Sequence, residues 1–322
     1  MEAITIPNTA TPHKVLRLIV TNRCNYHCIY CHHEGMNDST EDLLKISDYI
    51  FLIELAREFF ENIAVAGGEP LLYENIIKIA EAVRYYFGQG VYLTTNGSIP
   101  LTNVINNIHL FERINISINS LIPNTFRRIT GNDISQTLFD NVENLLGLNV
   151  EVHINTVLIP GINDLNEEIQ KLLDYSRNKG LPIEFLHLMA RSPVEKSVSC
   201  SAIIKFRNYM EILGYSSNFR YRPFSHPNTL YYKNAHKVIF RDYAQIIDSD
   251  SCSNCSMKAI CTEGMCHIRL LPNGLLTACM HGLQMDILKF IKVRDSKKII
   301  DAIVTLQKLY DRPIHWKKLC VS

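Results

Sequence analysis

The stretch that decides the fold reads Val15-Leu16-Arg17-Leu18-Ile19-Val20-Thr21-Asn22-Arg23-Cys24-Asn25-Tyr26-His27-Cys28-Ile29-Tyr30-Cys31. Its first six residues are apolar except for one arginine, which predicts a strand. Three cysteines with the spacing C-x3-C-x2-C follow directly. Thiolates are the usual ligands of iron–sulfur clusters, and three of them leave one iron of a four-iron cube without a protein ligand. Since an open coordination position distinguishes catalytic from structural metal sites, the stretch predicts a reactive metal centre at a strand end.

Five further apolar runs repeat the pattern of a strand followed by a polar turn. The predicted strands cover 15–20, 63–66, 91–95, 114–118, 152–158 and 183–188. Amphipathic stretches at 42–60, 76–87, 137–146 and 165–179 lie between them and predict helices. This alternation predicts an α/β fold with a parallel sheet. Six units within residues 14–195 predict a partial (β/α)6 TIM-like barrel, and residues 196–322 are expected to form a C-terminal extension in which 297–310 is helical.

Polar or glycine-rich motifs stand at the ends of the predicted strands. In a βα barrel the active site gathers at the C-terminal strand ends, so these motifs are expected to meet. They are the cysteine run, Gly67-Gly68-Glu69-Pro70, Thr95-Asn96-Gly97, Ser117 with Asn119, Pro160-Gly161 and Met189. Their common position predicts a single site at this edge of the sheet.

Composition bounds the class of protein. The chain has 322 residues, of which 47% are hydrophobic, and its formal net charge is +1. This balance predicts neither a nucleic-acid partner nor a basic membrane-binding surface. No apolar run reaches the roughly 18 residues of a membrane span, and Met1 to His13 lacks the apolar core of a signal peptide. We therefore expect a cytoplasmic protein with no membrane association.

Cysteines are frequent, with ten in the chain. Eight of them fall into two clusters, at 24–31 and 252–279. In a chain without a leader, such clustering predicts metal binding rather than disulfide bonds. Cys200 and Cys320 are isolated in the sequence and are expected to be ordinary buried or surface thiols.

The second cluster contains five thiols and predicts an auxiliary iron–sulfur cluster, with zinc as the alternative metal. Its members are Cys252, Cys255, Cys261, Cys266 and Cys279. Four protein ligands would complete a four-iron cube. The preferred set joins Cys252, Cys255 and Cys261 to Cys279. The alternative set, Cys261, Cys266 and Cys279, would leave an iron open for substrate.

The first cysteine run and the Gly67–Pro70 turn together closely resemble the radical S-adenosylmethionine (SAM) superfamily. The alternative is a structural zinc knuckle, with His32 or His33 as its fourth ligand. The resemblance implies a [4Fe-4S] cluster on Cys24, Cys28 and Cys31 whose open iron binds SAM. It implies reductive cleavage of SAM to a 5′-deoxyadenosyl radical, which abstracts a hydrogen atom from substrate. It also implies an external electron donor such as flavodoxin or ferredoxin.

The same resemblance implies which residues contact SAM. Backbone groups of the glycine turn and Glu69 suit the amino group, and Tyr30 matches an aromatic residue that touches adenine. Ser117 and Asn119 match ribose contacts, although the family often has Asp at the second position. The full expected set is Tyr30, Gly67, Gly68, Glu69, Pro70, Thr94, Asn96, Ser117, Asn119 and Met189.

Further stretches resemble the GTP 3′,8-cyclases of molybdenum-cofactor biosynthesis. The similarity extends over about 14–195 and, less closely, 252–282, and it implies substrate contacts at Arg17, His153, His267 and Arg269. The cyclases hold GTP with basic residues, but the matching positions here include Ala64 and His153. Each lost charged contact to a phosphate would weaken binding by about 1.5–3 kcal/mol. The sequence therefore predicts a paralogue that acts on a less charged small molecule, such as a nucleoside, nucleotide or sugar derivative.

Three alternatives stay open at this point. The first is the GTP 3′,8-cyclase itself. The second is a peptide-modifying radical SAM maturase, which often carries an N-terminal recognition domain; only 23 residues precede Cys24. The third is a non-enzymatic iron–sulfur or zinc protein, which predicts no SAM binding. An assay of SAM cleavage distinguishes the third alternative from the first two.

Overall fold

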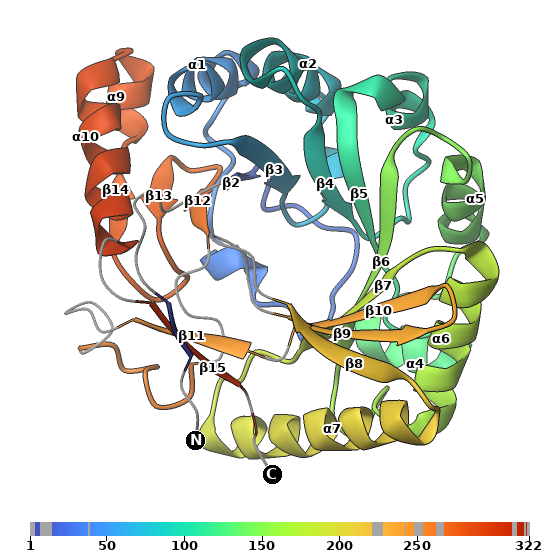
Figure 1. Cartoon of the computed structure of the whole chain (residues 1–322). Coiled ribbons are helices and arrows are strands. Elements are labelled where there is room, and N and C mark those ends of the chain that lie inside the picture. Colours follow the sequence, from blue (N-terminus) through green and yellow to red (C-terminus); the bar gives the residue numbers. More distant parts are fainter. Residues whose placement is uncertain are drawn as a thin grey trace.

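A curved sheet of twelve strands, order β14-β13-β12-β2-β3-β4-β5-β6-β7-β10-β9-β8, organises the chain. The computed structural model describes residues 4–6, 15–37, 39–220, 228–241, 243–247, 254–261, 267–310, 314–318 and 320. Six successive strands are parallel neighbours: β2 (Val15–Ile19), β3 (Asn62–Ala66), β4 (Val91–Thr95), β5 (Phe111–Ser117), β6 (Glu151–Leu158) and β7 (Ile183–His187). The sheet curls into an open barrel with helices outside it (Figure 1).

The helices cover the outer face of the six strands and confirm the predicted alternation. They are α1 (Ile46–Ala56), α2 (Ile76–Phe87), α3 (Thr102–Asn106), α4 (Pro123–Thr130), α5 (Gln136–Leu145), α6 (Asn166–Lys179) and α7 (Pro193–Ile212). Short 3-10 turns occur at η1 (His33–Gly35), η2 (Pro70–Leu72) and η3 (Ile108–Leu110). All six predicted strands are present, and the largest displacement of a strand start is at β5, which begins three residues early. The partial-barrel prediction is confirmed.

Strands from residues after 195 extend the same sheet on both sides. β10 (His236–Arg241) lies parallel to β7, and β9 (Asn228–Lys233) and β8 (Ser216–Arg220) follow it. On the other edge β12 (Ile268–Leu270) lies parallel to β2, followed by β13 (Leu275–Thr277) and β14 (Gln284–Asp286). In the described part of this region, three helical segments follow β14: α9 (Leu288–Lys292), α10 (Ser296–Gln307), which confirms the predicted helix, and η4 (Lys308–Tyr310).

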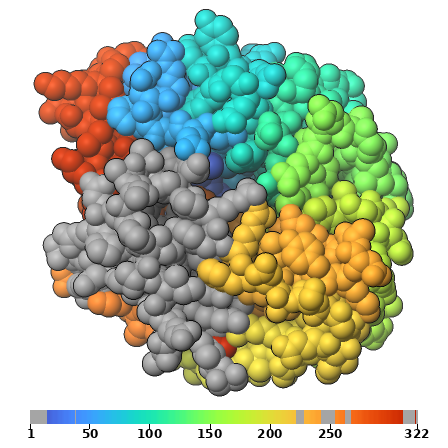
Figure 2. Space-filling model, in the orientation of Figure 1, coloured from blue at the N-terminus to red at the C-terminus, as the bar shows by residue number. Residues whose placement is uncertain are grey.

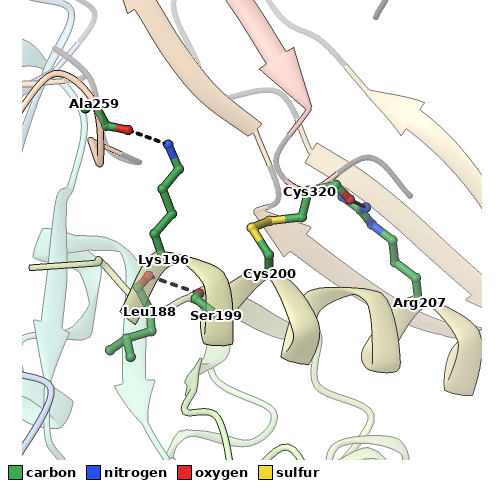
Figure 3. The surroundings of a disulfide bond; sticks show 7 residues. All are labelled: Leu188, Lys196, Ser199, Cys200, Arg207, Ala259 and Cys320. Carbon is green, nitrogen blue, oxygen red and sulfur yellow. Dashed lines mark hydrogen bonds between the residues drawn. A yellow bond between two sulfur atoms is a disulfide. The ribbon is translucent and has the colours of Figure 1, made fainter. Parts of the chain in front are cut away.

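A separate three-stranded sheet joins distant parts of the chain. Its order is β1 (Ile4–Ile6), β15 (Ile314–Lys318) and β11 (Tyr243–Ile247). Just beyond β15, Cys320 forms a disulfide with Cys200 of α7 (Figure 3). The expectation that these two cysteines are isolated thiols is wrong, because a separation of 120 residues in sequence hides their closeness in space. The described residues contain no helix long and apolar enough to cross a membrane.

The two faces of the curved sheet differ in chemistry. Alternate residues of a strand point to opposite faces. Leu16, Leu18, Ile114 and Ile116 belong to the buried core with the outer helices. The polar residues and Tyr92 that alternate with such core positions form what we call the inner-face set: Arg17, Tyr92, Thr94, Arg113, Asn115, Ser117, Glu151, His153, Asn155, Glu184, Arg241 and Arg269. Closed βα barrels usually fill this space with branched apolar side chains, whereas here the polar inner-face set stands beside apolar residues such as Ile19 and Ala66.

The strand ends that carry the predicted motifs open toward one side of the molecule. In the space-filling view, α1 and α2 and the β8–β10 segment lie on opposite flanks of the visible face (Figure 2). The glycine turn, the cysteine loop and the residues after β4 and β5 follow the C-terminal ends of parallel strands. The fold therefore gathers them at one edge, as the sequence predicts.

Candidate active site

The cysteine loop lies between the end of β2 and helix α4. Its backbone donates from His27 N to Thr130 O and from Ile29 N to Ile129 O, both at 2.9 Å. Cys24 and Cys31 are exposed and Cys28 is half-buried. Backbone N–H groups of Tyr26 and His33 donate to the sulfurs of Cys24 and Cys31, both at 3.4 Å. Such N–H donors are among the groups that tune an iron–sulfur cluster.

The three thiols of this loop share one electrostatic environment. Burial raises the pKa of Cys24, Cys28 and Cys31, and that of Cys28 reaches about 12. Negative charge on Cys31 and Cys24 adds to the rise of the pKa of Cys28. Metal ligation has to displace these protons, and the positive charge of an iron centre favours the thiolate forms. The donor set therefore fits a cluster.

Zinc and a four-iron cube require different spacings of three thiolates. Among the described residues, no three His, Cys, Asp or Glu side chains gather closely enough to hold one ion. The ligands of a zinc ion all lie within about 2.3 Å of it. In a four-iron cube each thiolate binds its own iron, so the three sulfurs stand further apart.

The Gly67–Glu69 turn is joined to the residues just before Cys24. Gly68 N donates to Thr21 O and Glu69 N donates to Arg23 O, both at 2.8 Å. A Cβ atom at residue 68 would lie 2.2 Å from Arg23 O, which no side chain can tolerate. The glycine is therefore required by the close approach of two backbones. This contact holds the glycine turn against the cysteine loop.

Glu69 is a buried carboxylate that accepts hydrogen bonds from the end of β4. It accepts from Thr95 Oγ1 and Asn96 N at 2.7 Å and from Leu71 N at 3.1 Å. Burial raises the pKa of Glu69, while these three hydrogen bonds oppose the rise. The Asn96 amide also donates to Asn25 Oδ1 at 2.9 Å, within the cysteine loop. The motifs after β2, β3 and β4 thus form one hydrogen-bonded unit.

Tyr30 and Asn119 contact each other across the site. Asn119 Nδ2 donates to the Tyr30 hydroxyl at 2.9 Å, and Asn119 Oδ1 accepts from Val157 N at 2.8 Å. Burial raises the pKa of Tyr30 well above its usual range, which keeps the phenol protonated. Asn163, which the sequence did not single out, is buried and donates to Asn119 O at 2.7 Å. Two predicted SAM contacts are therefore held in fixed positions.

The other predicted SAM contacts lie on the inner face or at strand ends. Thr94 Oγ1 accepts from Asn115 Nδ2 at 3.3 Å. Ser117 is half-buried at the end of β5, and Met189 is half-buried after β7. Pro70 begins the 3-10 turn η2 and is buried. The structure brings these positions to one edge.

Two predicted substrate residues, Arg17 and Arg269, bind the same carboxylate. They stand opposite each other on β2 and β12. Glu34, three residues after Cys31, accepts from both and is buried. Burial alone would raise the pKa of Glu34, but the charges of Arg17 and Arg269 outweigh it and lower the pKa to about 2. The sequence by itself does not identify Glu34. The signal that could have indicated an acidic partner is the presence of two arginines, each within an apolar strand near a cysteine cluster.

Of the remaining predicted substrate residues, His153 lies on another strand and His267 contacts Arg269 through its backbone. His153 is buried on β6, and its Nε2 lies 2.7 Å from Glu151 Oε1 at the start of that strand. Its Nδ1 atom is buried without a hydrogen-bond partner in the described residues. His267 stands just before β12, where its carbonyl accepts from Arg269 Nη1 at 3.5 Å.

The second cysteine cluster is described in part. Cys255, Cys261 and Cys279 are half-buried, and Cys252 and Cys266 lie outside the described residues. A Cβ atom at residue 282 would lie 2.6 Å from Cys279 Sγ, so the chain passes close to that sulfur. On α7, Lys196 Nζ donates to Ala259 O at 2.7 Å and anchors the turn that carries Cys255 and Cys261 (Figure 3).

Known proteins share these features. Residues 18–175 match the Radical SAM superfamily. The chain carries a radical SAM domain. The resemblance inferred from the cysteine and glycine motifs is confirmed, and so is the prediction of an enzyme. The superfamily implies a [4Fe-4S] cluster and SAM, and the three thiols of the cysteine loop fit that cluster.

Relatives of this chain include proteins named GTP 3′,8-cyclase. The probable GTP 3′,8-cyclase of Methanothermobacter thermautotrophicus is 26% identical over 277 residues, which cover 82% of this chain and 83% of that protein. The protein with the same name from Saccharolobus islandicus is 25% identical over 304 residues, which cover 91% and 92%. The chain is similar to these cyclases.

Solved structures show the same fold. Streptococcus suis SuiB bound to S-adenosylmethionine aligns with a TM-score of 0.58 at 11% identity, over 88% of this chain and 64% of that chain. The native protein anSMEcpe with bound AdoMet aligns with a TM-score of 0.53 at 16% identity, over 84% and 75%. This chain spans less than two thirds of SuiB. At these identities the likeness concerns the fold.

Proposed function

We propose that this protein cleaves SAM reductively and abstracts a hydrogen atom from a small polar molecule that binds at the C-terminal strand edge, against the inner-face set. One observation carries the proposal: the cysteine loop, the Gly67–Glu69 turn and the Asn96 turn form one hydrogen-bonded unit at that edge. A structural metal knuckle would not require this union of three strand ends.

The chain's own residues have distinct parts in this activity. Cys24, Cys28 and Cys31 hold the cluster, and the backbone N–H groups of Tyr26 and His33 stabilise negative charge on two of the sulfurs. The glycine turn, Asn96, Ser117 and Asn119 hold SAM. When bound, the cluster and SAM together supply the 5′-deoxyadenosyl radical. Glu69 positions the Asn96 turn, and the Asn119 amide fixes the Tyr30 ring.

The substrate is a nucleoside, nucleotide or sugar derivative. Hydroxyl, amide and imidazole groups of the inner-face set, among them Thr94, Asn115 and His153, suit a molecule rich in hydrogen-bonding groups. The name of the relatives makes GTP a candidate, and the GTP 3′,8-cyclase activity is the first alternative. Incubation of the enzyme with GTP and with a panel of nucleosides and sugar nucleotides separates these two readings.

An auxiliary [4Fe-4S] cluster belongs to the proposal. Cys255, Cys261 and Cys279, with Cys252 as the fourth ligand, would hold it, and the turn of the first two is anchored on α7. Each cube contains four irons. Reconstituted protein is therefore expected to bind about eight irons per chain, and a variant with serine at residues 255, 261 and 279 about four. Equal iron in both proteins would contradict the auxiliary cluster.

The decisive test is anaerobic. Reconstituted protein with SAM and a chemical reductant is expected to form 5′-deoxyadenosine, and alanine at residue 24, 28 or 31 is expected to abolish it. Cys255→Ala should retain uncoupled cleavage, because the first cluster is untouched. Absence of 5′-deoxyadenosine from a fully iron-loaded protein would refute the enzyme reading. A cytoplasmic flavodoxin or ferredoxin should replace the chemical reductant.

A further inference from the structure

Glu34 is a buried carboxylate between two guanidinium groups. Its Oε1 lies 2.6 Å from Arg17 Nη2, and its Oε2 lies 3.0 Å from Arg269 Nε. The side chain of Arg269 is 2% exposed and that of Glu34 is 9% exposed, whereas Arg17 remains 25% exposed. The ion pairs join β2, β12 and the segment that follows Cys31.

The backbone around Glu34 is shaped for this contact. His33 and Glu34 have φ angles of 50° and 53°. This is a left-handed backbone conformation that residues other than glycine rarely adopt. The ring nitrogen His32 Nδ1 accepts from Glu34 N at 3.1 Å and stabilises the turn. The backbone holds a disfavoured conformation at His33 and Glu34. In this conformation the Glu34 carboxylate contacts arginines of the inner-face set.

The other inner-face arginines are paired in the same way. Arg113 Nη2 lies 2.6 Å from Glu151 Oε2. Arg241 forms an ion pair with Glu184, which is buried. All four arginines of the inner-face set therefore have a carboxylate partner. A polyphosphate that took Arg17, Arg269 or Arg241 would remove a counter-ion from a buried carboxylate, which is Glu34 for the first two and Glu184 for the third.

We propose that Glu34 is a specificity-determining residue that withdraws Arg17 and Arg269 from substrate. The site then selects uncharged or zwitterionic polar molecules over polyphosphates. This inference rests on the proposed function, because it assigns the substrate class of the same site. A nucleoside or a sugar fits the inference, whereas a nucleoside triphosphate does not.

Calorimetric titration with inorganic tripolyphosphate tests the proposal on the reconstituted, full-length protein at near-physiological salt. The wild type is expected to bind with a Kd of about 1 mM or weaker. Glu34→Gln releases two guanidinium groups, and each recovered charged contact raises affinity about tenfold. We therefore expect binding ten- to hundredfold tighter than in the wild type. Glu34→Asp, which keeps the charge, should stay close to the wild type.

Asp48→Asn is the matched control. Asp48 is also a buried carboxylate between two cations, Lys292 at 2.6 Å and Arg294 at 3.2 Å, but it lies on α1 outside the barrel. The affinity of the Asp48→Asn protein for tripolyphosphate should stay within about twofold of the wild-type affinity, because exposed cations are screened at this salt concentration.

Two results would overturn the inference. One is micromolar binding of tripolyphosphate by the wild type, which can be measured even where Glu34→Gln does not fold. The other is unchanged binding in a Glu34→Gln protein that holds its full iron content. Formation of 5′-deoxyadenosine, measured in the same preparations, reports on the proposed function separately, because it needs no substrate.

Discussion

At the residue scale, Glu34 is the side chain whose loss should affect stability most clearly. Glu34→Gln leaves the charges of Arg17 and Arg269 buried without a counter-ion, which costs about 3–5 kcal/mol for a broken buried pair. The free energy of unfolding of the metal-free protein in urea should fall by about that amount. Asp48→Asn should cost less, because Lys292 and Arg294 are 40% exposed and regain water. Equal losses would contradict the buried-pair account.

The stabilisation by Glu34 also depends on pH. Its pKa falls from an ordinary value of 4.5 to about 2 in the folded chain. The depressed pKa means that the stabilising contribution is complete above about pH 4.5 and is lost as the pH falls toward 2. The difference in unfolding free energy between the wild type and Glu34→Gln should therefore shrink over this window. A difference that stays constant from pH 6 to 3 would argue against an ionised Glu34.

Local pattern indicates the ligands but not their partners. The spacing of Cys24, Cys28 and Cys31 is a property of one short segment, so the sequence predicts it directly. The pairing of Glu34 with Arg269 joins residues 235 positions apart and depends on the registration of β12 on β2. A single sequence does not determine the register of these two strands. The sequence therefore predicts Arg269 as a substrate contact and does not identify Glu34 as its partner.

At the scale of elements, the glycine turn joins two strand ends, and Gly68 sets their distance. Gly68→Ala places a Cβ atom 2.2 Å from Arg23 O and must separate the turn from the cysteine loop. We expect formation of 5′-deoxyadenosine to fall at least about tenfold, with iron lost from the first cluster. Gly88→Ala is the control, since it has open space and a positive φ of 70°. It should cost about 1 kcal/mol of stability and leave cleavage unchanged.

Amphipathic periodicity predicts the elements of the core well, because each βα unit buries one face against its own neighbours. The helix predicted at 76–87 has the same bounds in the structure. The sequence does not predict strands β8 to β11, since their apolar patterns are short and the pairings β10–β7 and β11–β15 join distant segments. β10 completes an edge of the sheet only because β7 is available beside it.

At the scale of the whole molecule, the region after residue 195 is bound to the core at several places. β10 and β12 extend opposite edges of the sheet, and α7 anchors the turn of the second cysteine cluster. The proposed division at residue 195 therefore marks a change of sequence pattern within one continuous sheet. An ion pair joins the segments that carry the two cysteine clusters, because Glu34 stands three residues after Cys31 and Arg269 three residues after Cys266.

The disulfide between Cys200 and Cys320 offers a test of this whole-molecule organisation. It links α7 to the segment after β15, where Arg207 Nη1 also donates to Cys320 O at 2.8 Å (Figure 3). A crosslink across 120 residues restricts the unfolded chain and therefore stabilises the folded state by about 2–4 kcal/mol. Amide hydrogens of Ile314–Lys318 should therefore exchange at least about tenfold faster in Cys200→Ser than in the oxidised wild type.

Reduction of the wild type should reproduce this acceleration, while the same reductant should leave Cys200→Ser unchanged. Exchange in α2, on the far side of the barrel, serves as the internal reference. A reducing compartment would open this bond. Identical exchange of β15 in the oxidised, reduced and variant proteins would show that the β1-β15-β11 sheet holds the C-terminal segment without the disulfide.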